Sequence, residues 1–364
     1  MIFCGDISLS RKGAVQIIDL PVDLKFKYWF GNLEGTLVDV SSEERNALLR
    51  KHGVFNSFEA IQGLNKTLRF VGFSLANNHI FNYGGAETSL DNIKKLGLSC
   101  VGLGKDLNDA SKCISIKDEY GINYTILAFA WRLTESQIAS RRSEGVNPWN
   151  KKHSLESVRR AVDEGKQNII VFVHWNYEMN YLSFPYDRQL AHELIDAGAA
   201  AVIGCHSHRI QPVEVYKGKP IIHGLGNFLF ENDVFFNGEL NFPNISEEEY
   251  AFEIDDNGDY KIHVFHYNTT ENTLHYVRTE TLTEKEEGIK NLSNLSSTEY
   301  EKQYVTYFYS KPKRQRILCP IFKTDESRLS YWLKERERDI HETLLKAVLK
   351  MRLHRGSKSG KVYK

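Results

Sequence analysis

The sequence predicts an α/β fold, in which short buried strands alternate with helices. Two apolar runs, 169–173 and 201–203, are bounded by polar residues and are therefore typical of buried strands. Between them, apolar residues recur at the spacing of a helix. Both runs stop on histidine: His174 follows the first, and His206 and His208 follow the second. In open α/β sheets the loops at the carboxyl ends of the strands form the ligand crevice, so the same pattern predicts where a site would lie.

The other predicted strands are short apolar runs that break on polar or glycine-containing turns. In chain order they are expected at 2–4, 28–30, 70–75, 113–116, 124–130, 213–216, 220–223, 250–254 and 260–267. Turn residues at 217–219 and 255–258 indicate hairpins, so the strands on either side of each turn are expected to pair with one another.

Helices are predicted where apolar residues follow the 3.6-residue period. In chain order they are expected at 41–52, 57–65, 84–96 and 154–164, around the apolar face formed by Leu190, Ala191, Leu194 and Ile195, and at 284–310 and 329–353. Ser41 or Ser42 is a candidate N-cap with Glu44 in the first turn, and Gly97 follows the end of the third helix. Residues 354–364 are rich in Gly, Ser and Lys, and we expect them to be disordered.

The length of 364 residues, with 41% hydrophobic content, favours more than one structural part. We expect a main domain over 1–245, a β-hairpin and helical extension that packs on it over 246–310, and a third part over 311–364. The third part would consist of a basic link, an amphipathic helix and the disordered tail.

Charge and cysteine content exclude some classes of protein. Lys and Arg together number 47, as do Asp and Glu, so no global charge favours nucleic acid or an anionic membrane surface. The five cysteines are scattered without a C-x-x-C pair, which suits a reducing compartment; we expect Cys205 to be a compact apolar residue. No signal-peptide core and no run of about eighteen apolar residues is present, so we expect no transmembrane segment and a cytoplasmic location.

Five predicted strands end on potential metal ligands. These residues are Asp6, Glu34, Asn78 with His79, His174, and His206 with His208. In extended backbone, alternate residues share a face, so His206 and His208 can both point into one cleft. A mixed set of oxygen and nitrogen ligands suits Zn, Mn or Fe better than Ca, and six or more candidates are enough for two ions bridged by a carboxylate.

Each of these residues also has an ordinary structural interpretation. Gly5-Asp6 can be a turn, Glu34 can cap a helix, Asn78 can be a loop residue in left-handed backbone, and His174 can be a half-buried core histidine. Taken singly, these interpretations are favoured for all but His206 and His208. The repeated placement at strand ends favours a shared site.

The motifs resemble those of the CapA family of bacterial capsule synthesis and poly-γ-glutamate biosynthesis proteins, over roughly residues 1–232. They are Gly5-Asp6, Asn32-Leu33-Glu34, Ala76-Asn77-Asn78-His79, His174-Trp175, Gly204-Cys205-His206-Ser207-His208 and Leu225-Gly226-Asn227-Phe228. CapA proteins are similar in fold to calcineurin-like metallophosphoesterases. The resemblance therefore implies a four-layer α/β/β/α sandwich of the metallophosphoesterase type, here with a C-terminal helical extension.

The resemblance also implies roles for the candidate residues. Asp6 and His208 would hold one metal, Asn78, His174 and His206 would hold the other, and Glu34 would bridge them. His79 would be the general acid. Metallophosphoesterases begin with Asp-x-His, whereas this chain has Ser8 at the histidine position, and Glu34 stands where those enzymes have a bridging Asp. These departures leave open one ion, or two of unequal affinity.

Two functions from different classes follow. The ligand set favours a metal-dependent hydrolase that acts on a phosphoester or on an amide of a glutamate polymer. The alternative is a non-catalytic accessory protein that binds an anionic polymer or a biosynthetic partner protein. Nucleic-acid binding through the basic run 311–316 is disfavoured, because short basic runs are usually solvated and no aromatic residues are interleaved with this one.

Overall fold

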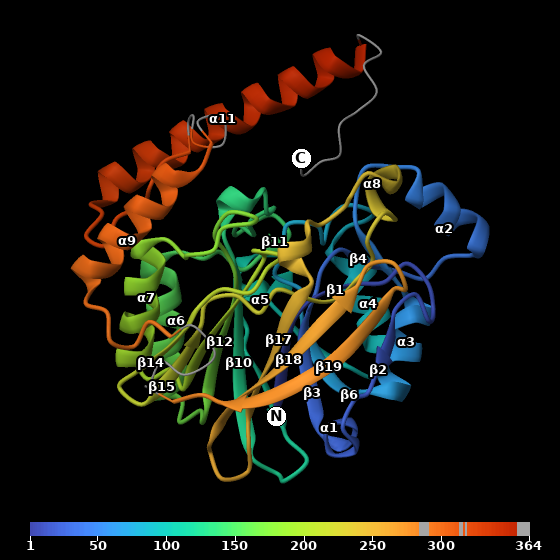
Figure 1. Cartoon of the computed structure of the whole chain (residues 1–364), viewed down its shortest axis with the longest axis horizontal. Coiled ribbons are helices and arrows are strands. Elements are labelled where there is room, and N and C mark those ends of the chain that lie inside the picture. Colours follow the sequence, from blue (N-terminus) through green and yellow to red (C-terminus); the bar gives the residue numbers. More distant parts are fainter. Residues whose placement is uncertain (284–290, 313–315, 317–318, 355–364) are drawn as a thin grey trace.

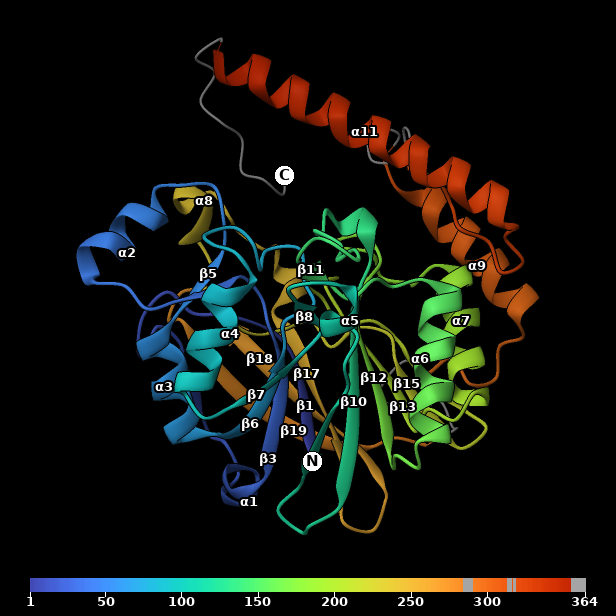
Figure 2. The ribbon, with the colours of Figure 1, turned by 180° about the vertical axis from the view of Figure 1, so that it is seen from behind.

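The computed structural model describes residues 1–283, 291–312, 316 and 319–354. Two β-sheets pack face to face, and helices cover their outer faces (Figures 1 and 2). The predicted four-layer α/β/β/α sandwich is confirmed. Phe30 of the first sheet meets Phe172 of the second edge to face, with ring centroids 5.5 Å apart, in the core between the sheets.

The first sheet joins the N-terminal strands to strands from the second half of the chain. Its order is β2 (Gln16–Ile18), β19 (Thr273–Thr281), β18 (Tyr260–Asn268), β17 (Glu248–Ile254), β1 (Ile2–Ser8), β3 (Tyr28–Leu33), β6 (Arg69–Ser74) and β7 (Ser99–Val101). A further strand, β16 (Asn227–Phe230), also pairs with β1. Strands β1, β3, β6 and β7 run parallel to one another, so their carboxyl ends reach the same edge.

The second sheet has the order β14 (Val213–Tyr216), β15 (Lys219–Ile222), β13 (Ala201–Cys205), β12 (Ile169–His174), β10 (Asn123–Ala130) and β9 (Ile114–Lys117). Strand β12 is buried along its whole length because its neighbours, the facing sheet and the outer helices cover it. Parallel strands need a crossover, and α7 (Pro185–Asp196) supplies the one between β12 and β13.

Helices flank the sandwich on both sides. On the side of the first sheet lie α2 (Ser42–Leu49), α3 (Phe58–Thr67) and α4 (Ala86–Lys95). On the side of the second lie α6 (Lys151–Asp163), α7 and α9 (Ser297–Ser310), and α11 (Arg328–His354) extends beyond them (Figure 1). Among the described residues, no helix has the length and apolar character needed to cross a bilayer.

Short elements fill the connections. They are α1 (Val22–Phe26), the β4 (Thr36–Val38) and β5 (Phe55–Ser57) pair, the β8 (Leu103–Gly104) and β11 (Gly145–Val146) pair, α5 (Leu107–Ala110), η1 (Arg132–Thr134), α8 (Phe235–Gly238) and η2 (Asn244–Ser246).

Local sequence explains several boundaries. Ser41 caps α2 in a capping box with Glu44, as the sequence indicated, but the helix ends at Leu49 rather than at 52. Both hairpins expected from turn residues form, as β14–β15 and β17–β18.

The segment after 245 adds strands to the first sheet, since β17 pairs directly with β1. The three-part division of the chain stays a prediction. The expectations for 284–290 and for the tail at 355–364 concern residues outside those that the structure describes.

Candidate metal centre

The predicted site residues come from the same end of both sheets. Asp6 lies in β1, and Glu34 and Asn78 follow β3 and β6. His174 ends β12, and His206 follows β13. Because strand ends of both sheets meet at this edge, Asp6 and His206 become neighbours although they are 200 positions apart in the chain.

Asp6 links the two sheets within the site. It is fully buried, and its Oδ1 accepts a 2.8 Å hydrogen bond from Asn32 Nδ2. Its Oδ2 accepts a 3.1 Å bond from the backbone N–H of His206 and lies 3.5 Å from His208 Nδ1. Burial raises the pKa of Asp6, and the nearby His208 opposes that shift. The carboxylate is therefore held in place by donors from both sheets.

His174 and Asn78 form a second contact between the sheets. Asn32 Nδ2, which can only donate, lies 3.2 Å from His174 Nδ1, so that ring nitrogen accepts. His174 Nε2 then carries the proton and donates to Asn78 Oδ1 at 2.9 Å. Burial and the neighbouring imidazoles lower the pKa of His174 well below its ordinary value, so the ring is held neutral, the form that binds metal.

Glu34 is a fully buried carboxylate at the centre of the cluster. Both carboxylate oxygens are buried and lack a hydrogen-bond partner among the described residues. Its Oε1 lies 3.7 Å from His208 Nε2 and 3.8 Å from His79 Nε2. Burial, with Asp6 and Glu178 nearby, raises the pKa of Glu34 well above its ordinary value. Burying a carboxylate without hydrogen bonds or a counterion is energetically unfavourable, and a bound cation would remove this penalty.

Asn227 orients His208 toward Glu34. The Oδ1 atom of Asn227 lies 2.9 Å from His208 Nδ1, so this ring nitrogen donates, and the lone pair of the neutral ring is on Nε2. Metal-binding histidines usually donate their other N–H to an oxygen in this way. His206 Nδ1 is likewise buried without a partner in the described part of the chain. Two imidazole nitrogens and a carboxylate are thus available at one place.

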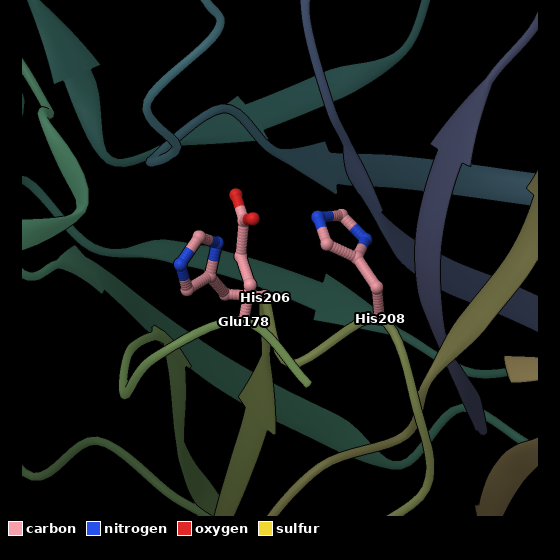
Figure 3. A group of neighbouring side chains, drawn as sticks. All are labelled: Glu178, His206 and His208. Carbon is pink, nitrogen blue, oxygen red and sulfur yellow. The ribbon is translucent and has the colours of Figure 1, made fainter. Parts of the chain in front are cut away.

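Two groups of side chains have the spacing of a metal site, with ligand atoms within 4.8 Å of one another. The first contains Asp6, Glu34 and His208. The second contains His206 and His208 with Glu178, which reaches them from the loop after β12 (Figure 3). Neither group contains His174, which lies beside the second one with its ring 4.5 Å from that of His206. The assignment of each ligand to one of two ions stays a prediction.

His79 lies at the edge of this cluster. Its Nδ1 is 2.9 Å from Asn82 Oδ1, an acceptor, so Nδ1 carries a proton and Nε2 faces Glu34. The side chain is 18% exposed, whereas Glu34 is fully buried. Burial lowers the pKa of His79, and the hydrogen bond to Asn82 and the charge of Glu178 oppose that effect. Its location between carboxylate and solvent suits proton transfer to a substrate.

Three residues of the site were not assigned roles from the sequence. Asn32 and Asn227 lie within the motifs that carried the family resemblance, and alternation along β3 could have placed Asn32 on the face of Glu34. No sequence signal marks Glu178. Its loop contains Asn176 and Met179 in left-handed backbone, with φ of 68° and 58°, and such turns are hard to predict.

Backbone strain also concentrates in the histidine loop. His206 and His208 have φ of 87° and 51°, a region that non-glycine residues rarely adopt. Cys205, the last residue of β13, is buried, and burial raises the pKa of its thiol well above the ordinary value. Ser8 donates its hydroxyl to Phe55 O at 3.2 Å.

Comparison with known proteins gives relatives of similar sequence. The chain is 31% identical over 241 residues to the PGA biosynthesis protein CapA of Bacillus subtilis, which covers 63% of this chain and 62% of the relative. It is 32% identical over 171 residues to the capsule biosynthesis protein CapA of Bacillus anthracis, covering 46% of this chain and 41% of the relative. The chain thus matches less than two thirds of the length of these relatives.

Solved structures give more distant matches. A putative 5'-nucleotidase from Staphylococcus aureus matches with 12% identity and a TM-score of 0.41, over 84% of this chain and 58% of that one. A calcineurin-like phosphoesterase from Bacillus subtilis matches with 13% identity and a TM-score of 0.38, over 85% of this chain and 98% of that one.

The family model described as bacterial capsule synthesis protein PGA_cap matches residues 24–232, which is more than half of the chain. The matched range includes Glu34, Asn78, His174, His206 and His208. This chain belongs to the PGA_cap family of bacterial capsule synthesis proteins.

Proposed function

We propose that this chain is a metal-dependent hydrolase of capsule or poly-γ-glutamate biosynthesis. The observation that carries the proposal is Glu34, whose two buried oxygens lack partners among the described residues and lie beside Nε2 of His208. The names of the two CapA relatives, which refer to PGA biosynthesis and capsule biosynthesis, support the biosynthetic setting. The substrate would be a phosphoester or an amide of a glutamate polymer, and biosynthetic proteins would be partners.

The donor set fits one or two divalent ions of Mn, Zn or Fe. Asp6, Glu34, Asn78, His174, His206 and His208 are the proposed ligands, and Glu178 joins them on the geometry of the structure. A divalent metal held there would activate water as a nucleophile at neutral pH and polarise the scissile group. Asn32 and Asn227 would hold Asp6 and His208 in position, and His79, once protonated at Nε2, would give that proton to the leaving group.

The test of this function is turnover by the metal-loaded chain. A generic phosphodiester and a γ-linked glutamate oligomer are offered separately, with His208→Ala as the inactive control. We expect hydrolysis of one of them by the wild type and none by His208→Ala.

An accessory protein without catalysis is the second candidate. Ser8 stands at the position of a histidine in metallophosphoesterases, so no imidazole is available there, and its hydroxyl donates to Phe55 O. If the chain carries metal and hydrolyses neither substrate, this second function is favoured.

Glu34→Gln is expected to abolish metal binding and yet to stabilise the chelator-treated protein by about 1–3 kcal/mol. The substitution removes a buried carboxylate that has no hydrogen-bond donor among the described residues. In the folded protein the pKa of Glu34 is raised above its ordinary value of 4.5. Glu34 therefore lowers the free energy of unfolding increasingly as the pH rises above 4.5. The advantage of Glu34→Gln should therefore be larger at about pH 8 than at about pH 5 in urea unfolding. A variant less stable than the metal-free wild type at both pH values would contradict this.

The residues from Asp325 onward are expected to be dispensable for metal binding. All proposed ligands precede Arg209, although Tyr331 of α11 accepts a 3.0 Å bond from Trp131 and Asp339 pairs with Arg132 at 3.0 Å. A chain ended at Thr324 should therefore lose some stability and keep its metal stoichiometry. Elemental analysis of the folded, shortened chain checks this, and loss of metal would disprove it.

A further inference from the structure

Two cations converge on the loop that carries Glu178. Lys311, at the end of α9, donates from Nζ to Asn180 Oδ1 and lies 4.7 Å above the ring of Tyr307. The guanidinium of Arg209 lies 4.9 Å above the ring of Tyr181. The two tyrosines are in contact, since the backbone N–H of Tyr181 donates to Tyr307 Oη at 2.7 Å. The pair of cations is thus built into one aromatic and polar frame.

No carboxylate forms an ion pair with Arg209 or with Lys311 within the described ranges. Burial, with the charge of Arg209 added, lowers the pKa of Lys311 to about 8. Lys217 provides a contrast, because it also lies over a tyrosine ring, at 5.1 Å, but pairs with Asp196 at 2.6 Å. Two neighbouring cations that are partly buried without a counterion are unfavourable unless an anion joins them.

Buried donors without acceptors lie at the same place. Asn180 is 1% exposed, and its Nδ2 has no partner among the described residues. Its orientation is fixed because Lys311 can only donate, which requires the amide oxygen to face Lys311. Arg209 Nε is also buried without a partner in the described structure. Both orphaned atoms are donors, so the group that would satisfy them is an acceptor.

We propose that Arg209, Lys311 and Asn180 form an anion-binding subsite, for a carboxylate or phosphate oxygen, next to the metal centre. Arg209 directly follows His208, and Asn180 lies two residues after Glu178. The backbone joins the two loops, since Met179 N donates to Ser207 O at 2.9 Å and Gln211 Nε2 donates to Asn180 O at 2.8 Å. The subsite would hold a second charged group of an anionic substrate, and only this purpose rests on the proposed function.

The C-terminal extension supplies part of this subsite. Lys311 follows α9, and Arg338 of α11 lies 4.7 Å above the ring of Tyr177 on the same loop. Both helices lie beyond the second sheet at the end where the metal centre forms (Figure 1). The extension therefore brings positive charge to a site whose proposed metal ligands all come from the first part of the chain.

The test is equilibrium binding to the full chain after chelator treatment, so that metal does not contribute. Inorganic phosphate and a γ-linked glutamate oligomer are titrated separately. A charged hydrogen bond to an anion is worth enough that Arg209→Gln and Lys311→Gln should each weaken binding by about tenfold or more. Lys217→Gln is the matched control and should bind as the wild type does. Arg209→Lys keeps the charge and should lose less than Arg209→Gln.

The binding results identify the anionic group that the subsite accepts, or they overturn the proposal. Binding of phosphate alone, or of the oligomer alone, identifies the source of the anionic group. Wild type that binds neither at millimolar concentration overturns the proposal, and so do Arg209→Gln and Lys311→Gln variants that are folded by thermal unfolding and bind like Lys217→Gln. Failure of hydrolysis with intact binding that depends on Arg209 would reject the catalytic function and leave the subsite in place.

Discussion

His79→Ala is expected to keep its metal and lose turnover by about 10²–10⁴-fold, the usual contribution of a general acid. The ring lies 3.8 Å from Glu34 Oε1 without belonging to either of the ligand groups, and Asn82 holds its Nδ1. Removing it therefore removes a proton donor and leaves the metal ligands unchanged. The measurement is metal content and turnover on a substrate with a poor leaving group and on one with an acidic leaving group.

The loss should be smaller for the acidic leaving group, because that group departs without a proton. Asn78→Ala is the paired variant, since it removes the oxygen that contacts His174 Nε2 and should lose metal as well as rate. If His79→Ala loses metal as fully as Asn78→Ala, the histidine is a ligand and its role as an acid fails.

Glu214→Gln is expected to destabilise the fold by about 3–5 kcal/mol, because it leaves a buried arginine without its counterion. Glu214 is 1% exposed and accepts bonds from Arg188 Nε at 2.9 Å and Nη2 at 2.6 Å. His192 Nε2 and His223 Nε2 lie 2.7 and 3.4 Å from its oxygens. Arg188 also donates to Leu295 O at 2.8 Å, so the cluster fastens the C-terminal extension to the second sheet.

Burial raises the pKa of Glu214, but the hydrogen bonds from His192 and His223 outweigh it and hold the pKa below its usual range. A depressed pKa gives stability that is present above the unfolded value of 4.5 and is lost in acid, so the effect of the variant should shrink below about pH 4. Glu193→Gln is the matched control, because Glu193 forms a surface pair with Lys151 at 2.6 Å. Urea unfolding that gives equal losses for both variants would contradict the account.

Elements of the fold could be predicted where their burial requires a run of apolar residues. Strand β12 is covered on both faces, so its apolar run stands out, and β13 is similar. Strand β19 was not predicted because much of it is exposed and polar residues dominate it. The three-residue β7 is too short for periodicity to identify.

The site could be predicted as far as strand ends determine it. Asp6, Glu34 and His208 meet because parallel strands bring their carboxyl ends to one edge. Glu178 and the contact between Asn180 and Lys311 could not be predicted, because they depend on the path of an irregular loop and on where α9 ends. Periodicity carries no information about either.

The central claim is that this edge of the sandwich binds a divalent transition metal, and elemental analysis of protein purified without chelator tests it most directly. We expect at least one transition-metal ion per wild-type chain and a strong loss of metal in His206→Ala and in His208→Ala. The surface variant His266→Ala, whose side chain is 53% exposed on β18, should keep its metal. Full metal occupancy in both His206→Ala and His208→Ala, or a wild type without metal, would contradict it.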